Sequence, residues 1–334
     1  MIERIRFKNF KALKDAEVKL GPFNLIVGPN GSGKSSLLQA FEVLAKPNHF
    51  GHRQFRTLGA NVDEYSIELL WSVDRLSFWC GTFFTGAEPK PRRRGLSQPA
   101  PTDKDEAHFW SSIKSSRVYA LEPSKMANSV NLSQVLELSR TGDNLAGALT
   151  HLSDQGDESY DQMREELQRW LPEFDSIIFK NDQNSQRSFS LRQASTRQPV
   201  PAQELSEGTL LSLALLTIIY QPSAPTVIGL EEPDRGLHPR LLREVRDALY
   251  RLAFPSDFGL KRKPVQVIAT THSPLFLDLF KDHPEQIIIA EKNADGTASF
   301  RNLADDKELI EMIGDTPLGE VWYSGVLGGV PALK

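Results

Sequence analysis

The N-terminal part of the chain is built from short hydrophobic segments of different periods. Apolar residues mostly alternate with polar ones over residues 2–10 and 16–20, which predicts two antiparallel strands that each bury one face. The run at residues 23–27 is almost entirely apolar and predicts a buried strand. Over residues 37–44 the apolar positions follow helical spacing. We therefore expect two antiparallel strands, a buried strand and a helix, in that order.

The rest of the chain continues this mixture of strands and helices. Residues 65–73 and 76–80 have the pattern of a β-hairpin. Helical spacing or a strong apolar run predicts helices over residues 142–152, 159–170 and 211–220, and short apolar segments predict strands over residues 116–121, 174–179, 189–192, 226–230 and 265–269. This mixture indicates the α/β class of folds.

Residues 86–104 interrupt the pattern, because prolines and charged residues replace the apolar positions. Such a composition cannot build a core, so we expect a mobile loop. This stretch contains a cluster of four basic residues, Lys90, Arg92, Arg93 and Arg94. They would suit contact with the phosphate backbone of a nucleic acid, and they would equally suit a solvated loop that keeps the protein soluble.

A Gly-Pro-Asn-Gly-Ser-Gly-Lys-Ser-Ser segment lies between the buried strand and the first helix and matches the phosphate-binding pattern G-x-x-x-x-G-K-[ST]. In this arrangement the backbone N–H groups and the helix dipole favour an anion. Lys34 is expected to reach the β- and γ-phosphates, and the Ser35 hydroxyl is expected to ligate Mg²⁺. The residues predicted to bind the nucleotide are Gly28, Pro29, Asn30, Gly31, Ser32, Gly33, Lys34, Ser35 and Ser36.

Two later strands end in polar residues that suit the same site. Residues 226–230 are followed by Glu231 and Glu232, and adjacent carboxylates at the end of a buried strand are costly unless they serve a metal ion and a water. We expect Glu231 in the Mg²⁺ shell and Glu232 beside the attacking water. His272 follows the strand at residues 265–269. Ligands of parallel sheets bind where the strands end, so we expect His272 to contact the γ-phosphate.

A Leu-Ser-Glu-Gly-Thr segment at residues 205–209 precedes the apolar helix at 211–220. Ser206 is a good N-cap, and on one interpretation it only caps a buried helix. The same geometry presents backbone N–H groups and a hydroxyl to an anion, so both interpretations remain open.

Taken in order, four motifs resemble the ABC-class ATPases, and within them the RecF/SMC-like and OLD-like branch. They are the phosphate loop, the Leu-Ser-x-Gly segment, the strand ending in Glu-Glu-Pro-Asp-Arg-Gly-Leu-His-Pro, and the strand ending in Thr-His-Ser-Pro. The opening residues 5–12 and the closing residues 318–329 resemble predicted single-domain bacterial ATPases of that branch.

This resemblance implies an α/β fold of the P-loop NTPase class with an ABC-type head. Such a head has a central, mostly parallel sheet with helices on both faces, N-terminal antiparallel strands and an inserted α+β subdomain. We expect residues 1–80 to form the N-terminal lobe, 81–200 the inserted subdomain with a disordered basic loop at about 86–104, and 201–334 the C-terminal lobe.

The resemblance also carries functional roles over by position. It assigns catalysis to Lys34, Glu232 and His272, Mg²⁺ binding to Ser35 and Glu231, contact with ATP on a second copy of the chain to Ser206 and Gly208, and the loop at the dimer interface to Asp234. Two residues depart from the wider class, since Glu231 replaces an aspartate and Glu207 lies inside the Ser-x-Gly signature. The branch's glutamine-loop residue should follow the first helix, where Gln54 is a candidate.

Composition limits the classes of partner. A net charge of −4 predicts no general attraction to nucleic acid, so such binding would need a local basic patch. The single cysteine, Cys80, lies in an apolar run and is expected to be a buried thiol. No apolar run reaches the length of a membrane span and the N-terminus lacks a signal-peptide core, so we expect no membrane partner and a cytoplasmic protein.

The resemblance thus implies an ATPase that uses ATP and Mg²⁺ and forms a head-to-tail homodimer or higher oligomer around the nucleotide, acting in DNA repair or phage defence, with DNA among its partners. The alternative is a regulatory ATPase subunit that controls a separate effector nuclease or toxin without binding DNA. A transporter ATPase subunit is a more distant alternative, because the Gly-Leu-His-Pro segment and the strand-rich opening argue against it.

Overall fold

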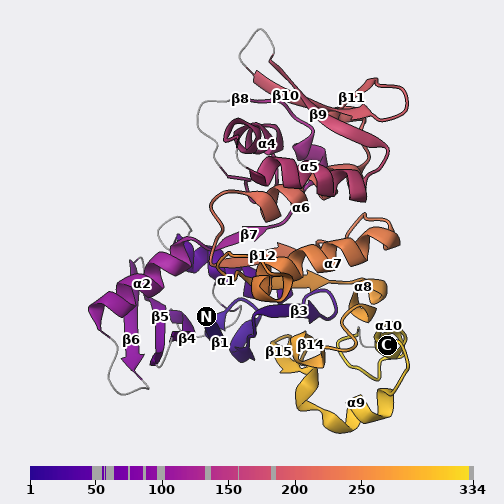
Figure 1. The fold of residues 1–334 in the computed structure, drawn as a ribbon. Helices are drawn as coiled ribbons and strands as arrows, with labels where there is room; N and C mark the ends of the chain where they lie inside the picture. The colour runs from indigo at the N-terminus through magenta and orange to yellow at the C-terminus, as the bar shows by residue number, and fades with distance from the viewer. Residues whose placement is uncertain are drawn as a thin grey trace. The chain divides into compact units, whose positions relative to one another are not determined.

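The computed structural model describes residues 1–46, 55, 57, 64–73, 76–85, 88–95, 102–131, 137–156, 158–181 and 186–330. The chain forms two compact units (Figure 1). Unit 1 comprises Met1–Val118, Pro225–Glu232 and Tyr250–Lys334, and unit 2 comprises Tyr119–Ala224 and Pro233–Leu249. The chain therefore enters unit 2 twice, and residues from distant parts of the sequence form each unit.

The centre of unit 1 is a six-stranded sheet in the order β15-β14-β3-β13-β12-β7. Its strands are β3 (Phe23–Val27), β7 (Arg117–Tyr119), β12 (Val227–Glu231), β13 (Gln266–Thr271), β14 (Ile287–Lys292) and β15 (Ala298–Asn302). Strands β14, β3, β13 and β12 pair in parallel, and β15 is antiparallel to β14. Every residue of β3 and β13 is buried, which explains their continuous apolar runs. The segments that follow β3, β12 and β13 therefore lie at the same end of the sheet.

One helix of unit 1 packs on this sheet, and a second helix packs on the first. Helix α1 (Lys34–Ala45) contacts β12 and β13, and it also contacts α2 (Asp103–Lys114). The apolar side chains of α1 join one core cluster with residues of the first two strands and of β3. The helix that hydrophobic spacing predicts over residues 37–44 is thus confirmed, and its buried face fixes the phosphate loop that precedes it.

A second sheet of unit 1 is antiparallel and has the strand order β2-β1-β4-β5-β6. Its strands are β1 (Ile2–Phe10), β2 (Leu13–Lys19), β4 (Glu64–Val73), β5 (Leu76–Thr85) and β6 (Glu88–Gly95). Ile5 and Phe7 are fully buried on one face of β1, as their alternation predicts. Phe10 is also fully buried and stacks against Phe7, because the chain departs from regular alternation at Asn9, whose φ is 53°. The predicted opening strands and the predicted hairpin are confirmed, and Cys80 is buried in β5.

The prediction of a disordered loop at residues 86–104 is wrong for Glu88–Gly95, which form strand β6. The register runs from Thr85 opposite Glu88 to Phe78 opposite Gly95. Without β6 the edge of β5 would expose its N–H and C=O groups, and pairing satisfies them. Pro89 and Pro91 are compatible with the edge position, because an edge strand needs ladder hydrogen bonds on one side only.

The same prediction is wrong at its C-terminal end, where helix α2 begins at Asp103. The Thr102 hydroxyl accepts a hydrogen bond from the Asp105 backbone N–H, and the Asp105 carboxylate accepts one from the Thr102 backbone N–H. This reciprocal capping box is readable in the sequence Thr-Asp-Lys-Asp. The Pro- and Arg-rich composition of the preceding stretch obscured it.

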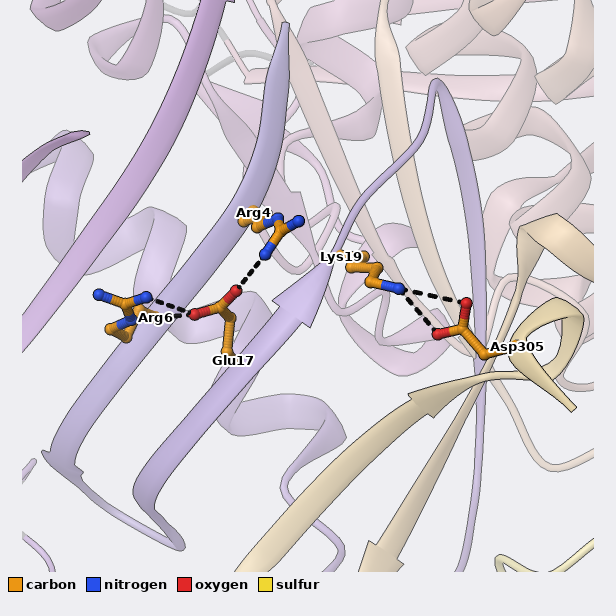
Figure 2. Close-up of polar contacts among 5 residues, drawn as sticks. All are labelled: Arg4, Arg6, Glu17, Lys19 and Asp305. Carbon is orange, nitrogen blue, oxygen red and sulfur yellow. Dashed lines mark hydrogen bonds and ion pairs between the residues drawn. The ribbon is translucent and has the colours of Figure 1, made fainter. Parts of the chain in front are cut away.

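Ion pairs lie along β1 and β2 (Figure 2). Glu17 of β2 lies between Arg4 and Arg6 of β1, at 2.8 and 2.6 Å, and Lys19 pairs with Asp305 at 2.9 Å. The Arg6 guanidinium also lies over the Trp79 ring, 4.5 Å from its centroid. All of these charged side chains are solvent-accessible, so each ion pair adds little stability.

Unit 2 combines a four-stranded antiparallel sheet with helices. Its elements are α3 (Pro123–Met126), β8 (Val130–Asn131), α4 (Leu145–Asp154), α5 (Glu158–Trp170), β9 (Phe174–Asn181), β10 (Gln186–Gln193), β11 (Pro199–Pro201), η3 (Ala202–Glu204) and α6 (Glu207–Tyr220). Helices α4 and α5 contact both the sheet and α6, and Figure 1 shows them between the two. Residues Thr209–Ile219 of α6 are all buried, which explains why this helix is apolar on every face.

The remaining elements are α7 (Pro239–Ala253), η4 (Pro255–Phe258), α8 (Pro274–Asp278), η5 (Pro284–Gln286), η6 (Leu303–Asp305), α9 (Lys307–Ile313) and α10 (Leu318–Tyr323). The division of the chain differs from the predicted boundaries at residues 81 and 201, because β6 and α2 belong to unit 1 and α6 belongs to unit 2. In the described part of the chain, no helix has the length and hydropathy needed to cross a lipid bilayer.

Candidate functional site

The phosphate loop connects β3 to α1, and its backbone conformation and close packing require glycine at several positions. Gly31 and Gly33 have φ angles of 77° and 86°, in the left-handed region that favours glycine. A Cβ on Gly28 would lie 2.2 Å from the carbonyl oxygen of Ala290, so only glycine fits there. These positions shape the loop so that it can enter α1 with the helix N-terminus open.

Lys34 is held beneath the loop. Its Nζ donates hydrogen bonds to the carbonyl oxygens of Gly28 at 2.7 Å and Pro29 at 2.9 Å, and the residue is only 7% exposed. Burial lowers the pKa of Lys34 to about 8, while the carboxylates of Glu232 and Glu231 act in the opposite direction. A triphosphate in the loop would replace these neutral carbonyl acceptors of the Lys34 ammonium with anionic phosphate oxygens.

Glu231 ends β12 and lies beside the start of α1. The Ser35 hydroxyl donates a hydrogen bond to Oε1 of Glu231. A hydroxyl and a carboxylate oxygen are ligands that Mg²⁺ prefers, so these two residues fit a Mg²⁺ ion that is also held by phosphate oxygens. Among the described residues there is no cluster of three or more His, Cys, Asp or Glu that would hold a metal without the nucleotide.

Glu232 has an unusual backbone for a non-glycine residue, with a φ of 48°. Its N–H donates to the carbonyl oxygen of Thr270 at 3.1 Å and to the Thr270 hydroxyl at 3.2 Å. These bonds to β13 fix the turn that follows β12. The left-handed conformation therefore has local support, and it turns the chain immediately after Glu231.

His272 follows β13 and lies opposite Glu232, with its Nε2 3.8 Å from Oε1 of Glu232. Burial lowers the pKa of His272, Lys34 lowers it further and Glu232 opposes the shift. The imidazole is therefore neutral near pH 7 and can donate one hydrogen bond and accept another. Both side chains remain about one-third exposed, which leaves them accessible to a ligand.

Unit 2 holds the other predicted site residues. Ser206 is the N-cap of α6, and its Oγ accepts a hydrogen bond from the Thr209 N–H at 3.1 Å. A Cβ on Gly208 would lie 2.9 Å from the carbonyl oxygen of Gly236, so this segment packs against the loop that follows β12. Asp234 lies in that loop and is buried. The capping interpretation of Ser206 is confirmed.

The structure thus brings together in unit 1 the predicted residues Lys34, Ser35, Glu231, Glu232 and His272. It brings together in unit 2 the predicted residues Ser206, Gly208 and Asp234. The four basic residues that were expected in a loop lie instead in strand β6; they are Lys90, Arg92, Arg93 and Arg94. Gln54 lies outside the described residues.

Two features near the loop have no counterpart in the sequence predictions. The β14–β15 hairpin lies against it, since Ala290 approaches Gly28 and a Cβ on Gly33 would lie 2.9 Å from the Cβ of Ala298. Gly329 also reaches it, because a Cβ on that residue would lie 3.4 Å from the Cα of Gly28. The only sequence signal was the glycine-rich end of the 318–329 segment.

Comparisons with known proteins give partial relatives of several kinds. The chain is 46% identical over 44 residues to an OLD nuclease of Thermus scotoductus, a match of 13% of this chain and 8% of that protein. It is 44% identical over 50 residues to the DNA replication and repair protein RecF of Magnetococcus marinus, covering 15% of this chain and 13% of that protein. It is 24% identical over 303 residues to Septu protein PtuA of Bacillus mycoides, covering 83% of this chain and 38% of that protein. Each match therefore spans well under two-thirds of the relative.

The SMC head domain from Thermotoga maritima has a similar fold. Its TM-score is 0.52 at 14% identity, and the alignment covers 90% of this chain and 98% of that one. The expected α/β fold of an ABC-type P-loop head is confirmed by this likeness. The family described as "AAA domain, putative AbiEii toxin, Type IV TA system" matches residues 23–278. The chain belongs to this family, and the RecF/SMC-like and OLD-like ATPase resemblance that its motifs predicted is confirmed.

Proposed function

We propose that this protein binds and hydrolyses ATP and acts as a nucleotide-dependent switch in the cytoplasm. The observation that carries the proposal is the position of Glu232 and His272, 3.8 Å apart, at the end of the sheet where Lys34 and Ser35 open helix α1. A phosphate loop alone would support binding only. A carboxylate and a neutral imidazole beside it add groups suited to proton transfer and to a γ-phosphate contact.

Each of these residues has a step in the proposed reaction. Glu232 accepts a proton from the water that attacks the γ-phosphate, and His272 donates a hydrogen bond to a γ-phosphate oxygen. Lys34 exchanges its carbonyl partners for phosphate oxygens. Ser35 and Glu231 would hold Mg²⁺, which neutralises phosphate charge when it is bound.

The switch is completed by a second copy of the chain. Ser206 offers the N-terminus of the 14-residue helix α6, a location that favours an anion. Ser206 and Gly208 belong to a different compact unit from the phosphate loop. We infer that they contact the γ-phosphate of ATP bound to the partner copy, with Asp234 in the loop at the interface, so that two ATP molecules join two chains head to tail.

The test is the mass of Glu232→Gln in solution, measured by light scattering with ATP, with ADP and without nucleotide. Removing the base should trap the ATP state as a dimer, and Lys34→Ala should stay monomeric under the same conditions. Ser206→Arg should bind ATP but not dimerise. A Glu232→Gln protein that stays monomeric with saturating ATP would contradict the dimer, and absent ATP binding by the wild type would contradict the whole proposal.

DNA is the first candidate for the output of the switch, because RecF is named as a DNA replication and repair protein. In the antiparallel sheet, Arg92 pairs with Gly81 and Arg94 with Trp79, so both occupy register positions of the face that carries Arg6. Arg93 pairs with buried Cys80 and occupies the opposite face. The face of this sheet that carries Arg6 is therefore the proposed DNA contact.

This register supplies a matched control for the DNA test. The double variant Arg92→Ala/Arg94→Ala should lose DNA affinity and part of its salt dependence, whereas Arg93→Ala should retain both. Thermal unfolding of both variants would verify that each is folded. Equal DNA binding by all variants, or none by the wild type at low salt, would contradict DNA as the output.

A separate effector protein is the second candidate. One relative is named a nuclease, and the family description names a putative toxin of a type IV toxin–antitoxin system. In this alternative the chain supplies ATP-driven conformational change, and another protein supplies nuclease or toxin activity. A partner that co-purifies with Glu232→Gln in ATP, but not with Lys34→Ala, would favour it over DNA.

A further inference from the structure

The β14–β15 hairpin lies alongside the phosphate loop and approaches it at three glycines, Gly28, Gly31 and Gly33. A Cβ on Gly28 would meet the Ala290 carbonyl, one on Gly31 would have the Lys292 Nζ as its nearest neighbour at 3.9 Å, and one on Gly33 would meet Ala298. The hairpin is therefore one wall of the loop, and Lys292 supplies the charged group of that wall.

The strand register explains this position. Strand β14 pairs in parallel with β3 from Ile287 opposite Leu25 to Ile289 opposite Val27. Strand β3 ends there and becomes the phosphate loop. Strand β14 continues to Lys292, which pairs with Ala298 of β15 instead. The last residues of β14 thus extend past the end of β3 and lie alongside the loop.

Lys292 differs from Lys34 in how its charge is used. The Lys34 ammonium is buried and bonded to the carbonyl oxygens of Gly28 and Pro29. Lys292 is exposed, and no carboxylate of the described chain forms a salt bridge with it. The neighbouring acid, Glu291, lies 3.5 Å from Arg301. The Lys292 charge is therefore available to a ligand in the loop.

We propose that Lys292 is a second cation for the phosphate chain of the nucleotide. This inference rests on the proposed ATP binding and adds a residue outside the phosphate-loop motif. A triphosphate carries several negative charges, and one buried lysine compensates only part of them. Lysine binds phosphate through a compact point charge on a flexible side chain. An exposed lysine beside Gly31 can therefore reach an oxygen atom of the bound triphosphate.

The test compares Lys292→Gln with Lys263→Gln by calorimetric titration of ATP and of tripolyphosphate into the full chain. Lys263 is exposed and precedes β13, so it lies at the end of the sheet away from the phosphate loop and gives the same charge change. Lys292→Gln should lower the affinity for both ligands about tenfold, which is the effect of losing one charge-assisted hydrogen bond. Lys292→Arg should keep most of the affinity, and Lys263→Gln should match the wild type.

Two results would overturn the role of Lys292. One is unchanged ATP affinity in Lys292→Gln, and the other is weaker ATP binding with unchanged tripolyphosphate binding, which would place the contact on the nucleoside. Failure of the wild type to bind ATP would instead overturn the proposed function. The two failures are therefore distinguishable in one series of titrations.

Discussion

The Ser35 hydroxyl donates a hydrogen bond to the carboxylate of Glu231, a residue 196 positions later in the chain. This contact joins the first turn of α1 to the last residue of β12. Both groups are oxygen ligands of the kind Mg²⁺ prefers, and the ion would need both to be turned toward the nucleotide. The hydrogen bond keeps them adjacent before a nucleotide arrives.

Glu231→Gln separates the two properties of this residue. The amide oxygen can still accept the Ser35 hydrogen bond, so the free energy of unfolding should stay within about 1 kcal/mol of the wild type. The lost charge should raise the Mg²⁺ concentration needed for half-maximal ATP binding by roughly tenfold. Titration of Mg²⁺ against a fluorescent ATP analogue measures this. An unchanged Mg²⁺ requirement would remove Glu231 from the metal site.

Glu232 offers a test of backbone strain that is independent of chemistry. Its φ of 48° lies in the left-handed region, where asparagine is tolerated better than glutamine. Glu232→Asn should therefore be more stable than Glu232→Gln by about 0.5–1 kcal/mol in urea unfolding. Both variants should lose about 10²–10⁴-fold in phosphate release, because both lack the base. Greater stability of Glu232→Gln, or a phosphate-release rate near that of the wild type in either variant, would contradict this account.

Lys34 predicts proton uptake on ATP binding. With its pKa lowered to about 8 by burial, the side chain is mostly neutral at pH 9 in the nucleotide-free protein. Triphosphate beside it favours the charged form and raises the pKa, so ATP binding should take up a proton between about pH 8 and 10. Below about pH 7 the lysine is already charged and uptake should vanish. Calorimetry in buffers of different ionisation enthalpy measures the proton count.

Lys34→Arg is the control for this measurement, because a guanidinium stays protonated at these pH values. Its ATP binding should show no uptake at pH 9. Equal uptake at pH 7 and pH 9 in the wild type would mean that another group accounts for the protons.

Because Gly329 lies next to Gly28, we expect a substitution at Gly329 to weaken ATP binding by the phosphate loop. Gly329→Ala and Gly259→Ala both place a side chain at a left-handed φ, of 61° and 68°, and should each lose about 1–2 kcal/mol of stability. The added methyl at 259 would have no neighbour within 4 Å, whereas the one at 329 would lie 3.0 Å from Cγ2 of Ile289 and 3.4 Å from the Cα of Gly28. Only Gly329→Ala should also weaken ATP binding. Equal ATP affinities in the two variants would separate Gly329 from the loop.

The sequence predicted the site best where motifs and strand ends coincide. Lys34, Glu231, Glu232 and His272 follow buried apolar runs, and parallel pairing alone brings the ends of such runs together. The strand β6 escaped prediction, because its prolines and arginines are unfavourable for a strand until β5 offers an edge to pair with. Lys292 and Gly329 escaped because their proximity to the loop depends on how far β14 extends past β3, a tertiary relationship without a local pattern.

The place of β3 in its sheet has a consequence for synthesis of the protein. Its neighbours are β14 and β13, and Asn24 of β3 bonds across to Val267, 243 positions later. At typical translation rates of roughly 5–20 residues per second, the ribosome needs about 10–50 s to reach that partner after making the phosphate loop. A nascent chain therefore carries the complete nucleotide motif long before the sheet that shapes it exists. Cellular ATP should be unable to assist the early folding of this protein, and chaperones that shield β3 have a long interval in which to act.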